Sequence, residues 1–371
     1  MVDILYIVNP IFKRKVMNES NKLLIKSGDK DYFVDVLNKE NIQDELLALE
    51  DKYRNVVILI DKNVFKLYPT MLNYENFNYL LLDATEQQKS FSNLDLIFDY
   101  YQKIGLQKKD VVVALGGGII QDIVSLTTKV YWRGVDHFLV PTTLLSMSDS
   151  SIGAKCGINY KDKKNQIAVF NSPCGVLQNL TFLETLHEGD IVSGVGEIVK
   201  LLITSNESDF IFLENKINSA IRNRVEFGPL IMKSLLSKKE VIEEDEYESD
   251  YRRVLNYGHT LGHAVESLSN YSIPHGVAVL WGMDIMNFIA VKRNFMSIEL
   301  YKRINNLIMK IYDISLINVD SYSKLIDFVR NDKKVEGTKI NIVYPKEIGS
   351  LVISGIEIDQ EFLENIKEYF N

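Results

Sequence analysis

The feature that most constrains the fold is a continuous apolar strand that runs directly into three glycines. Residues 110–115 read Asp-Val-Val-Val-Ala-Leu, Gly116, Gly117 and Gly118 follow, and a helix-compatible segment comes next. A β-branched run without alternation is typical of a strand buried on both faces of a parallel sheet. Glycines let backbone N–H groups approach a diphosphate, and a helix N-terminus favours negative charge. The segment therefore predicts an α/β fold with a phosphate site at this turn. Its glycine spacing differs from the dinucleotide fingerprint, and a plain strand-to-helix turn is the alternative.

Three further strand-like runs extend this pattern. Residues 55–60 and 137–140 are predominantly apolar, and residues 79–82 form a shorter run. Ligands of open α/β sheets gather at the carboxyl ends of the strands. Asp61 and Asn63, which come directly after the first of these runs, are therefore candidates for a nucleotide-side position.

A polar stretch rich in small residues follows the run at 137–140. Residues 149–159 predict a loop, in which Lys155 lies between small residues and glycines and can reach a ligand. Lys161 and Lys163 predict a solvated, lysine-rich turn. The pair at 164–165 precedes an apolar run and is a better candidate for a defined role.

The pattern changes from strand and loop to successive helices at about residue 180. This change predicts an α/β domain over residues 1–180 and a mainly α-helical domain over residues 181–371. Within the second domain, Glu197 and Lys200 stand three residues apart among valine, isoleucine and leucine. A surface ion pair is one interpretation of this pair. Because charged groups are rarely buried without a partner, the other is a metal for Glu197 and an anion for Lys200.

Three of the five histidines fall in one short segment of the second domain. His259 and His263 stand four apart, which places them on the same face of a helix, and His275 follows shortly after. The spacing favours either a transition-metal pair or a hydrogen-bonding pair without a metal. Arg252 and Asn256 continue the same three- and four-residue steps. A helix face this polar predicts the wall of a pocket for a metal and an anion, and a third metal ligand is still required.

Two other segments of the second domain carry simpler predictions. The acidic run at residues 243–250 predicts a solvated loop ahead of the histidine segment. Residues 332–334 predict a turn, and residues 341–345 predict a short strand near the pocket.

Composition excludes several classes of function. The net charge of −8 argues against a nucleic-acid surface, for which a basic excess is expected. No apolar run reaches the roughly 18 to 20 residues that span a bilayer, and the best candidate, residues 277–291, predicts a buried helix. Residues 1–3 lack the basic region of a signal peptide, and two cysteines imply no disulfide framework. We therefore expect a cytoplasmic protein with neither a nucleic-acid nor a membrane partner.

Taken in order, the motifs resemble those of the 3-dehydroquinate synthase family, whose members are sugar-phosphate cyclases. The resemblance covers roughly residues 55–350. The motifs that carry it, in the family order, are Gly116-Gly117-Gly118 with Asp122, Tyr131-Trp132-Arg133-Gly134, Pro141-Thr142-Thr143-Leu144, Asp149-Ser150-Ser151 with Lys155, Lys164-Asn165, Glu197 with Lys200, and Arg252, Asn256, His259, His263 and His275.

The resemblance implies a Rossmann-like N-terminal domain that binds NAD and a helical C-terminal domain that holds zinc or cobalt. It assigns the metal to Glu197, His259 and His275, which replaces the pairing of His259 with His263 and places His263 on the substrate. The implied chemistry is oxidation of a substrate hydroxyl by NAD, elimination of phosphate and re-reduction by the same cofactor. Ring opening and an internal aldol closure complete it.

The resemblance also implies substrate-binding residues. Contacts with a sugar phosphate, largely at its phosphate group, are implied for Lys155, Asn165, Lys200, Asn256 and His263. Arg252 and Lys238 match positions near a substrate carboxylate, and Asp149 matches one that faces the substrate hydroxyls. Lys334, or its neighbour Lys333, matches a late phosphate-binding lysine.

The implied cofactor contacts all fall in the N-terminal half of the chain. NAD contacts are implied for Asp61, Asn63, Glu86, Lys89, Gly117, Gly118, Asp122, Thr142, Thr143, Lys155 and Lys164. Arg133 is expected to reach the substrate phosphate across the interface of a homodimer.

Several positions depart from the family pattern. Gln121 stands where the family usually has glycine, Asn171 where it has an aromatic residue, and Gly196 where it has alanine. Cys156 replaces a threonine, Asp250 a glycine, and residues 201–202 a tyrosine–glycine pair, and about 20 N-terminal residues have no assigned counterpart. None of these changes removes a metal ligand or a principal substrate residue. They suggest a divergent branch that serves secondary metabolism or surface sugars.

The leading hypothesis is therefore a phosphate-eliminating lyase that converts 3-deoxy-arabino-heptulosonate 7-phosphate to 3-dehydroquinate. Arg252 favours an acidic substrate, because a guanidinium fork suits a carboxylate. A sister cyclase that acts on sedoheptulose 7-phosphate is the first alternative. A polyol dehydrogenase of the glycerol dehydrogenase type and a non-catalytic NAD- or metal-binding relative are the others.

Overall fold

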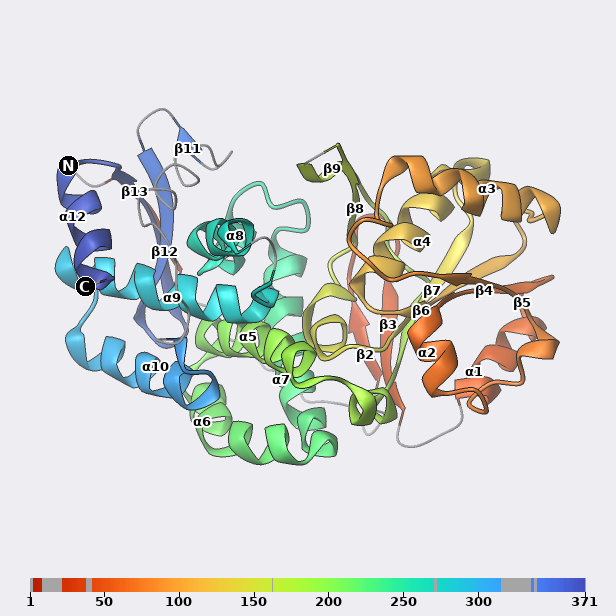
Figure 1. Ribbon diagram of the computed structural model, residues 1–371, viewed down its shortest axis with the longest axis horizontal. Helices are drawn as coiled ribbons and strands as arrows, with labels where there is room; N and C mark the ends of the chain where they lie inside the picture. The colour runs from red at the N-terminus through yellow and green to blue at the C-terminus, as the bar shows by residue number, and fades with distance from the viewer. Residues whose placement is uncertain are drawn as a thin grey trace. The chain divides into compact units, whose positions relative to one another are not determined.

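The structure, a computed structural model, describes residues 3–8, 22–37, 42–161, 163–269, 272–314, 335–336 and 339–370. The chain divides into two compact units, Lys15–Leu186 (the N-terminal unit) and Met1–Arg14 with His187–Asn371 (the C-terminal unit). Figure 1 shows the elements of both units with their labels. The sequence predicts a single boundary near residue 180, whereas residues 1–14 group with the C-terminal unit because strand β1 (Asp3–Val8) pairs with β13 (Ser350–Glu357).

The described part of the N-terminal unit is built on a seven-stranded sheet. Its spatial order is β2 (Lys22–Ile25), β3 (Tyr32–Leu37), β10 (Gly175–Asn179), β7 (Asp136–Pro141), β6 (Val111–Gly116), β4 (Val56–Asp61) and β5 (Asn78–Leu82). All neighbours in this sheet are parallel except β2 and β3. The continuous apolar runs of β4 and β6 are buried in the interior of the sheet, as their composition predicts.

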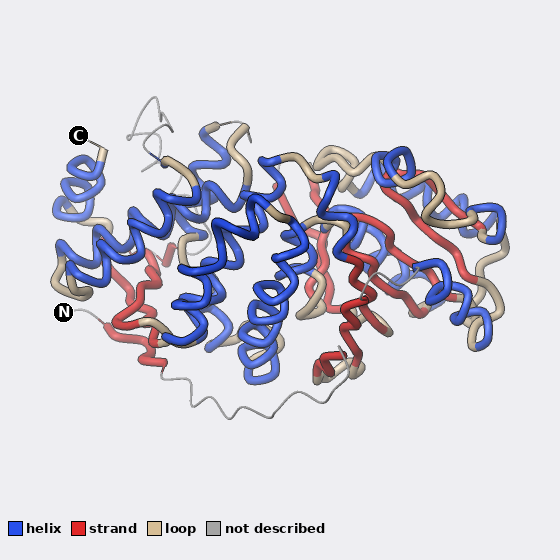
Figure 2. The backbone as a smooth tube through the Cα atoms, turned by 90° about the horizontal axis from the view of Figure 1, so that it is seen from below, coloured by secondary structure: helices blue, strands red, loops and turns tan. Residues whose placement is uncertain are grey.

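Helices flank this sheet. They are α1 (Ile42–Ala48), α2 (Lys62–Leu67), α3 (Leu94–Lys103) and α4 (Gly118–Val130). Helix α4 starts directly after the glycine turn and packs against β6 and β7. Figure 2 shows the strands of this unit running between helices. The predicted Rossmann-like α/β architecture is confirmed, and the carboxyl ends of β4, β6 and β7 share one edge.

The polar stretch at residues 149–159 is not the predicted loop. A π-helical turn (Ser146–Ser150) is followed by a two-stranded hairpin of β8 (Lys155–Tyr160) and β9 (Lys163–Phe170). Strand β8 buries Cys156, Gly157 and Ile158 in succession, so its sequence lacks the alternation that would have marked a strand.

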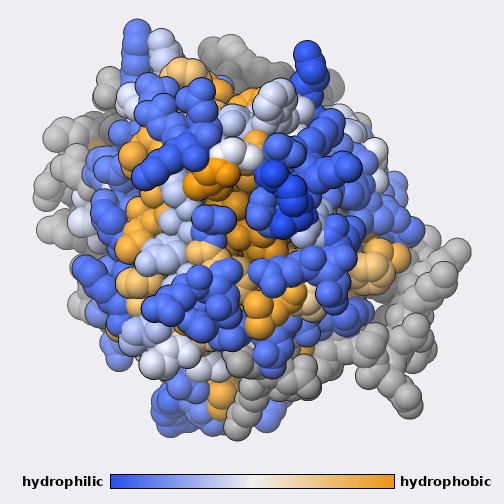
Figure 3. All heavy atoms as spheres, turned by 90° about the vertical axis from the view of Figure 1, so that its right-hand side faces the viewer, coloured by the Kyte–Doolittle hydropathy of each residue, from blue (hydrophilic) through white to orange (hydrophobic). Residues whose placement is uncertain are grey.

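The outer edge of the seven-stranded sheet carries a cluster of three aromatic side chains, of which Tyr79 is exposed and the other two are half-buried. Phe65, Tyr74 and Tyr79 pack together beside edge strand β5, with ring centroids 4.7 to 5.8 Å apart. Leu96 of α3 is also exposed. Figure 3 shows apolar surface in the middle of one face of the molecule, surrounded by polar and charged side chains.

The C-terminal unit is mainly helical, as predicted. Its helices are α5 (Glu188–Ser205), α6 (Glu207–Arg222), α7 (Phe227–Glu244), α8 (His259–Leu268), α9 (His275–Lys292), α10 (Ile298–Ile311) and α12 (Gln360–Tyr369). None of the helices in the described ranges is both long and apolar enough to cross a membrane.

An antiparallel sheet completes this unit. Its order among the described residues is β1, β13, β12 (Lys339–Glu347) and β11 (Val335–Glu336). The short strand predicted at 341–345 is confirmed as the middle of β12. The predicted turn at 332–334, with Lys333 and Lys334, lies outside the described residues.

The histidine segment is not one continuous helix. Residues Tyr251–Asn256 form a 3₁₀ turn, and α8 begins only at His259. Gly258 separates the two with φ of 77°, a left-handed conformation that glycine adopts without steric cost. Arg252 and Asn256 therefore belong to a separate turn and do not continue the face that carries His259 and His263.

Glycines allow α9 to lie unusually close to its neighbours. A Cβ atom on Gly282 would overlap the carbonyl oxygen of Gly258, and one on Gly196 of α5 would overlap that of Gly276. Gly196 stands where the family usually has alanine, so this chain brings α5 and α9 together at a position directly beside Glu197. Close packing of this kind fixes the helix ends that carry His259 and His275.

We expect Gly282→Ala to destabilise the protein by about 3 kcal/mol or more, because the new methyl group has no room and backbone must move. Urea denaturation of the purified variant measures the loss. Gly189→Ala is the matched control: its Cβ would lie 3.7 Å from Pro274, in ordinary contact, so stability should stay equal or rise slightly. Equal stability of the two variants would contradict the close approach of α8 and α9.

Candidate functional site

Helix α5 carries a buried ion pair on an otherwise apolar segment. Glu197 and Lys200 are only 1% and 3% exposed, and the Lys200 ammonium pairs with Oε2 of Glu197. The interpretation as a surface ion pair is therefore wrong. Burial of two charges is costly, and it is tolerated where further polar groups complete the site.

Two imidazoles converge on the other oxygen of this carboxylate. Nε2 of His259 lies 3.4 Å and Nε2 of His275 lies 3.0 Å from Glu197 Oε1. His259 is the first residue of α8 and His275 the first of α9, so both rings project from helix starts. The three predicted metal ligands thus meet, with their ligand atoms within 4.8 Å of one another.

The other ring nitrogen of each histidine is already engaged. Nδ1 of His259 lies 3.2 Å from the carbonyl oxygen of Tyr257, and Nδ1 of His275 lies 3.0 Å from Oε2 of Glu266. A carbonyl and an ionised carboxylate only accept hydrogen bonds, so both Nδ1 atoms carry the proton. In a neutral ring the Nε2 atom can then only accept a hydrogen bond. It faces Oε1 of Glu197, which also only accepts hydrogen bonds.

Acceptors that face one another need a proton or a cation between them. Zinc with nitrogen and oxygen ligands at about 2.0 to 2.2 Å in a tetrahedron separates those ligand atoms by about 3.4 Å. The two Nε2–Oε1 distances, 3.0 and 3.4 Å, lie close to this spacing. One carboxylate with two imidazoles is also a donor set found in catalytic zinc sites. The residues present therefore fit a zinc or cobalt ion.

Charges around the cluster keep Glu197 ionised. Burial opposes its ionisation, but the Lys200 charge and the interactions with His259 and His275 hold the pKa of Glu197 well below its usual range. Burial and Lys200 lower the pKa of His259, which favours its neutral form. Burial also disfavours charge on His275, but Glu197 and Glu266 outweigh it and raise the pKa of His275 to about 10. Without a metal, the cluster thus holds a proton that a cation would displace.

Glu266 is a functional candidate that the sequence analysis missed. It is buried on α8, three residues after His263, and its carboxylate fixes the tautomer and orientation of His275. The signal for it was available, since a carboxylate on an apolar helix beside two histidines needs a partner.

Replacing Glu266 with glutamine should weaken metal binding about 10- to 100-fold, the usual cost of losing an outer partner of a metal-bound histidine. Competition with a chelator of known affinity measures the change. Glu299→Gln in the first turn of α10, an exposed acid, is the matched control and should bind metal as the wild type does. Equal affinity of the two variants would remove Glu266 from the site.

Of the remaining C-terminal candidates, His263 lies beside this cluster. The His263 ring is exposed, with its centroid 5.3 Å from that of His259 and 5.9 Å from that of His275. His263, Glu266 and His275 form a second group of potential ligands. Lys238 is buried on α7.

The acidic run at 243–250 consists of the last two residues of α7 and a turn, and its residues are exposed or half-buried, as expected for a solvated loop. Hydrogen bonds order this turn. Asp245 accepts hydrogen bonds from the backbone N–H groups of Ser249, Asp250 and Arg252 at 2.8 to 3.0 Å. Burial opposes its charge, yet these bonds lower the pKa of Asp245 to about 2. The turn also receives predicted substrate residues: the buried Arg252 guanidinium donates to the Glu246 carbonyl, and Asn256 Nδ2 donates to Glu248 Oε1 at 3.0 Å.

In the N-terminal unit, the predicted phosphate turn is built as the glycines require. A Cβ on Gly117 would lie 2.9 Å from the Thr143 side chain, so that residue must stay small. The N–H of Thr142 donates to the Gly116 carbonyl at 3.3 Å, which joins the second predicted motif to the first. The first N–H groups of α4 have no acceptor within a helix and are available to an anion, so the residues fit a diphosphate.

Several predicted NAD-contacting residues gather beside the β8–β9 hairpin. Lys89 pairs with Asp122 at 2.5 Å, and Asp122 accepts from the Gly157 N–H at 3.3 Å. Asn159 links two other candidates, because its amide donates to Glu86 Oε1 at 2.7 Å and its oxygen accepts from the Asn165 N–H at 3.0 Å.

The other candidate binding residues of the N-terminal unit lie on different elements. Asp61 ends β4 and caps α2 by accepting from the Asn63 N–H at 2.8 Å. Lys155 is exposed at the start of β8, and Lys164 is half-buried on β9. Asp149 lies in the π-helical turn, and Arg133 is exposed after α4.

Comparison with known proteins decides the family. Residues 79–193 match the family described as 3-dehydroquinate synthase N-terminal, and residues 194–335 match 3-dehydroquinate synthase C-terminal. A 3-dehydroquinate synthase from Dictyoglomus thermophilum is 33% identical over 349 residues, which cover 94% of this chain and 95% of that protein. The chain belongs to the 3-dehydroquinate synthase family. The resemblance that the motifs indicated is thereby confirmed.

Solved structures share the fold of this 3-dehydroquinate synthase family member. A 2-deoxy-scyllo-inosose synthase, complexed with carbaglucose-6-phosphate, NAD⁺ and Co²⁺, matches with a TM-score of 0.84 at 21% identity over 94% of this chain and 99% of that one. A 2-epi-5-epi-valiolone synthase from Streptomyces hygroscopicus with NAD⁺ and Zn²⁺ matches with a TM-score of 0.80 at 22% identity over 97% and 99%. The predicted fold class is confirmed by these matches.

Proposed function

We propose that this chain converts 3-deoxy-arabino-heptulosonate 7-phosphate to 3-dehydroquinate, with NAD and a divalent metal as cofactors and with elimination of phosphate. The observation that carries the proposal is the convergence of Glu197, His259 and His275, whose facing acceptor atoms call for a cation. Family membership supports the reaction class. The metal and NAD in the two structural neighbours support the cofactors.

The chain's own residues bind and orient the reactants. The glycine turn and the start of α4 offer N–H groups to the cofactor diphosphate, and the Lys89–Asp122 pair stands beside them. The buried Lys200 ammonium provides a positive charge, fixed by Glu197, toward an anionic group of the substrate. His263, with its ring exposed beside the cluster, is placed to move a proton. When bound, NAD would supply reversible oxidation of a hydroxyl, and the metal would supply Lewis-acid stabilisation of neighbouring oxygens.

Phosphate release from candidate substrates tests this function. The protein is loaded with zinc or cobalt and NAD, and each sugar phosphate is added in turn. We expect phosphate release and a carbocyclic product from the heptulosonate phosphate. Turnover of sedoheptulose 7-phosphate alone would establish the sister-cyclase alternative. Binding of NAD and metal without turnover of either would favour a non-catalytic relative.

We further propose that the enzyme is a cytoplasmic homodimer. The exposed Arg133 follows Trp132, which is 60% exposed, and both residues hold positive φ angles. Sedimentation equilibrium tests the dimer: the expected mass is twice that of the chain, and Arg133→Ala should lower turnover without loss of the dimer. A monomer with full activity would remove any role for a partner's arginine.

A further inference from the structure

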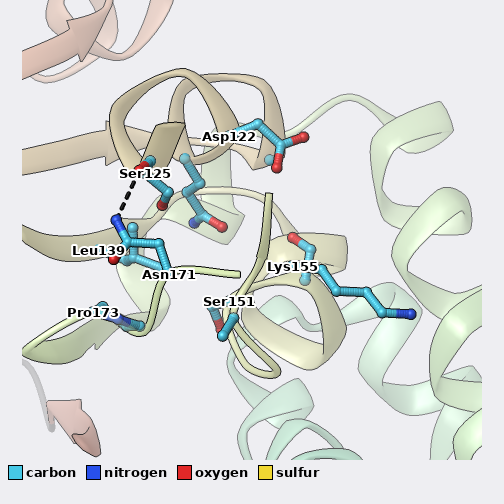
Figure 4. A pocket seen from close by; sticks show the side chains of 11 residues that line it. Asp122, Ser125, Leu139, Ser151, Lys155, Asn171 and Pro173 are labelled. Atoms are coloured by element: carbon cyan, nitrogen blue, oxygen red, sulfur yellow. Dashed lines mark hydrogen bonds between the residues drawn. The ribbon is translucent and has the colours of Figure 1, made fainter. Parts of the chain in front are cut away.

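A small cavity lined by both polar and apolar side chains lies beside the glycine turn of the N-terminal unit (Figure 4). Its volume is about 50 Å³. The first two turns of α4 form one wall, and the start of β8 with the loop at 171–173 forms the other. Gly118, the first residue of α4, lines it, so the cavity adjoins the proposed diphosphate site.

Three buried polar atoms in the cavity wall call for a ligand. Within the described part of the chain, Oε1 of Gln121 and the hydroxyl oxygens of Ser150 and Ser151 have no hydrogen-bond partner. Gln121 and Ser151 are only 4% and 2% exposed. Buried polar groups without partners are rare in folded proteins and costly, so they indicate a group that binds there.

The neighbouring polar groups are already satisfied, which restricts the chemistry of that ligand. Asp122 is paired with Lys89, and Asn171 Nδ2 donates to the Ser125 carbonyl at 2.7 Å, the bond drawn in Figure 4. The Lys155 side chain extends away from Asn171 in the same view. The cavity therefore suits a neutral group.

One acceptor and two hydroxyls are the complement of a primary carboxamide. Its N–H group would donate to Gln121 Oε1, and its oxygen would accept from Ser150 and Ser151. About 10–15 Å³ of such a cavity holds one water molecule, so the cavity has room for a planar group of a few heavy atoms.

We infer that this cavity receives the carboxamide of the nicotinamide ring and that Gln121 determines specificity for it, an inference that rests on the proposed use of NAD. Two residues that depart from the family pattern, Gln121 and Asn171, line this one cavity. Gln121 supplies an acceptor, and Asn171 closes the wall through its bond to α4. The recognition would thus be a property of this chain, added to the shared glycine turn.

The test compares NAD⁺ with the analogue in which an acetyl group replaces the carboxamide, because acetyl keeps the carbonyl and loses the N–H donors. Isothermal titration of the metal-loaded protein measures both affinities. We expect the wild type to bind NAD⁺ about tenfold more tightly than the analogue, since the analogue leaves Gln121 Oε1 unpaired. Gln121→Leu should bind NAD⁺ about tenfold more weakly and leave the affinity for the analogue unchanged.

Two further variants separate specificity from folding. Ser151→Ala should weaken both dinucleotides, because the carbonyl that it serves is present in each. Ser148→Ala is the matched control: its buried hydroxyl already donates to the Leu144 carbonyl at 2.8 Å, so neither affinity should change. Circular dichroism melting confirms that each variant is folded.

The outcomes distinguish this inference from the proposed function. Gln121 Nε2 also contacts the Gly116 carbonyl at 3.4 Å, so an equal loss of both dinucleotides in Gln121→Leu would show that Gln121 only supports the turn. Wild-type protein that binds NAD⁺ and the analogue equally well would overturn the inference and leave the proposed function intact. Failure to bind either dinucleotide would overturn both.

Discussion

Replacing His275 with alanine should remove the bound metal and lower turnover about a thousandfold or more. Catalytic zinc sites take three protein ligands, and two ligands from Glu197 and His259 would not retain the ion. A metal that stabilises developing charge contributes several kcal/mol, and about 4 kcal/mol corresponds to a thousandfold in rate. Metal analysis after dialysis and phosphate release from the heptulosonate phosphate measure the two effects.

His187→Ala provides the matched control for this experiment. His187 precedes α5 and is exposed, so its loss should change neither the metal content nor the rate. The wild type and the control should each hold about one zinc or cobalt per chain, as one shared site requires. Retention of metal and full turnover by His275→Ala would show that the cluster of Glu197, His259 and His275 is not the metal site.

Arg252→Ala should lower kcat/KM for the heptulosonate phosphate by about 30-fold or more. A hydrogen bond to a charged group contributes about 2 kcal/mol, and loss of the guanidinium leaves the substrate carboxylate without that partner. Turnover of sedoheptulose 7-phosphate, which has no carboxylate, should change much less. The ratio of the two kcat/KM values is the measurement, because any general damage to the site cancels in it.

The neighbouring arginine supplies the control. Arg253 is exposed where Arg252 is buried, so Arg253→Ala should keep the wild-type ratio. Arg252 also donates to the Glu246 carbonyl, and thermal melting shows whether its loss disturbs the ordered turn at 245–250. An unchanged ratio in a folded Arg252→Ala protein would show that this residue does not bind a carboxylate.

The sequence predicts those elements of the fold that neighbouring residues determine. Strand β6 and helix α4 follow from a β-branched run, three glycines and a helix-compatible segment, all adjacent in the chain. The same reasoning placed His259 near His263, and their rings do lie 5.3 Å apart. It also proposed a metal for Glu197, but it could not join Glu197 to the histidines as one ligand set, because Glu197 comes from another helix, and only the family resemblance combined it with His259 and His275.

Features that depend on distant contacts were beyond this reasoning. The pairing of β1 with β13 joins residues at opposite ends of the sequence, and the sequence of residues 3–8 does not indicate which strand they pair with. The break at Gly258 was not predicted, because packing against α9 decides its conformation: a Cβ atom there would lie 2.6 Å from the carbonyl oxygen of Val279. Glu266 is a different case, because its apolar helix and the nearby histidines already gave a signal for it; the sequence did not show that His275 is its partner.

The position of β1 has a consequence for how the protein is made. Residues 3–8 are synthesised before the N-terminal unit, yet their partner strand, residues 350–357, is synthesised after that whole unit and nearly all the helices. The N-terminal unit can therefore fold while translation continues, whereas this sheet must wait with an open edge. A shortened gene that starts after residue 14 would leave β13 permanently uncovered, and aggregation of the product is the expected result.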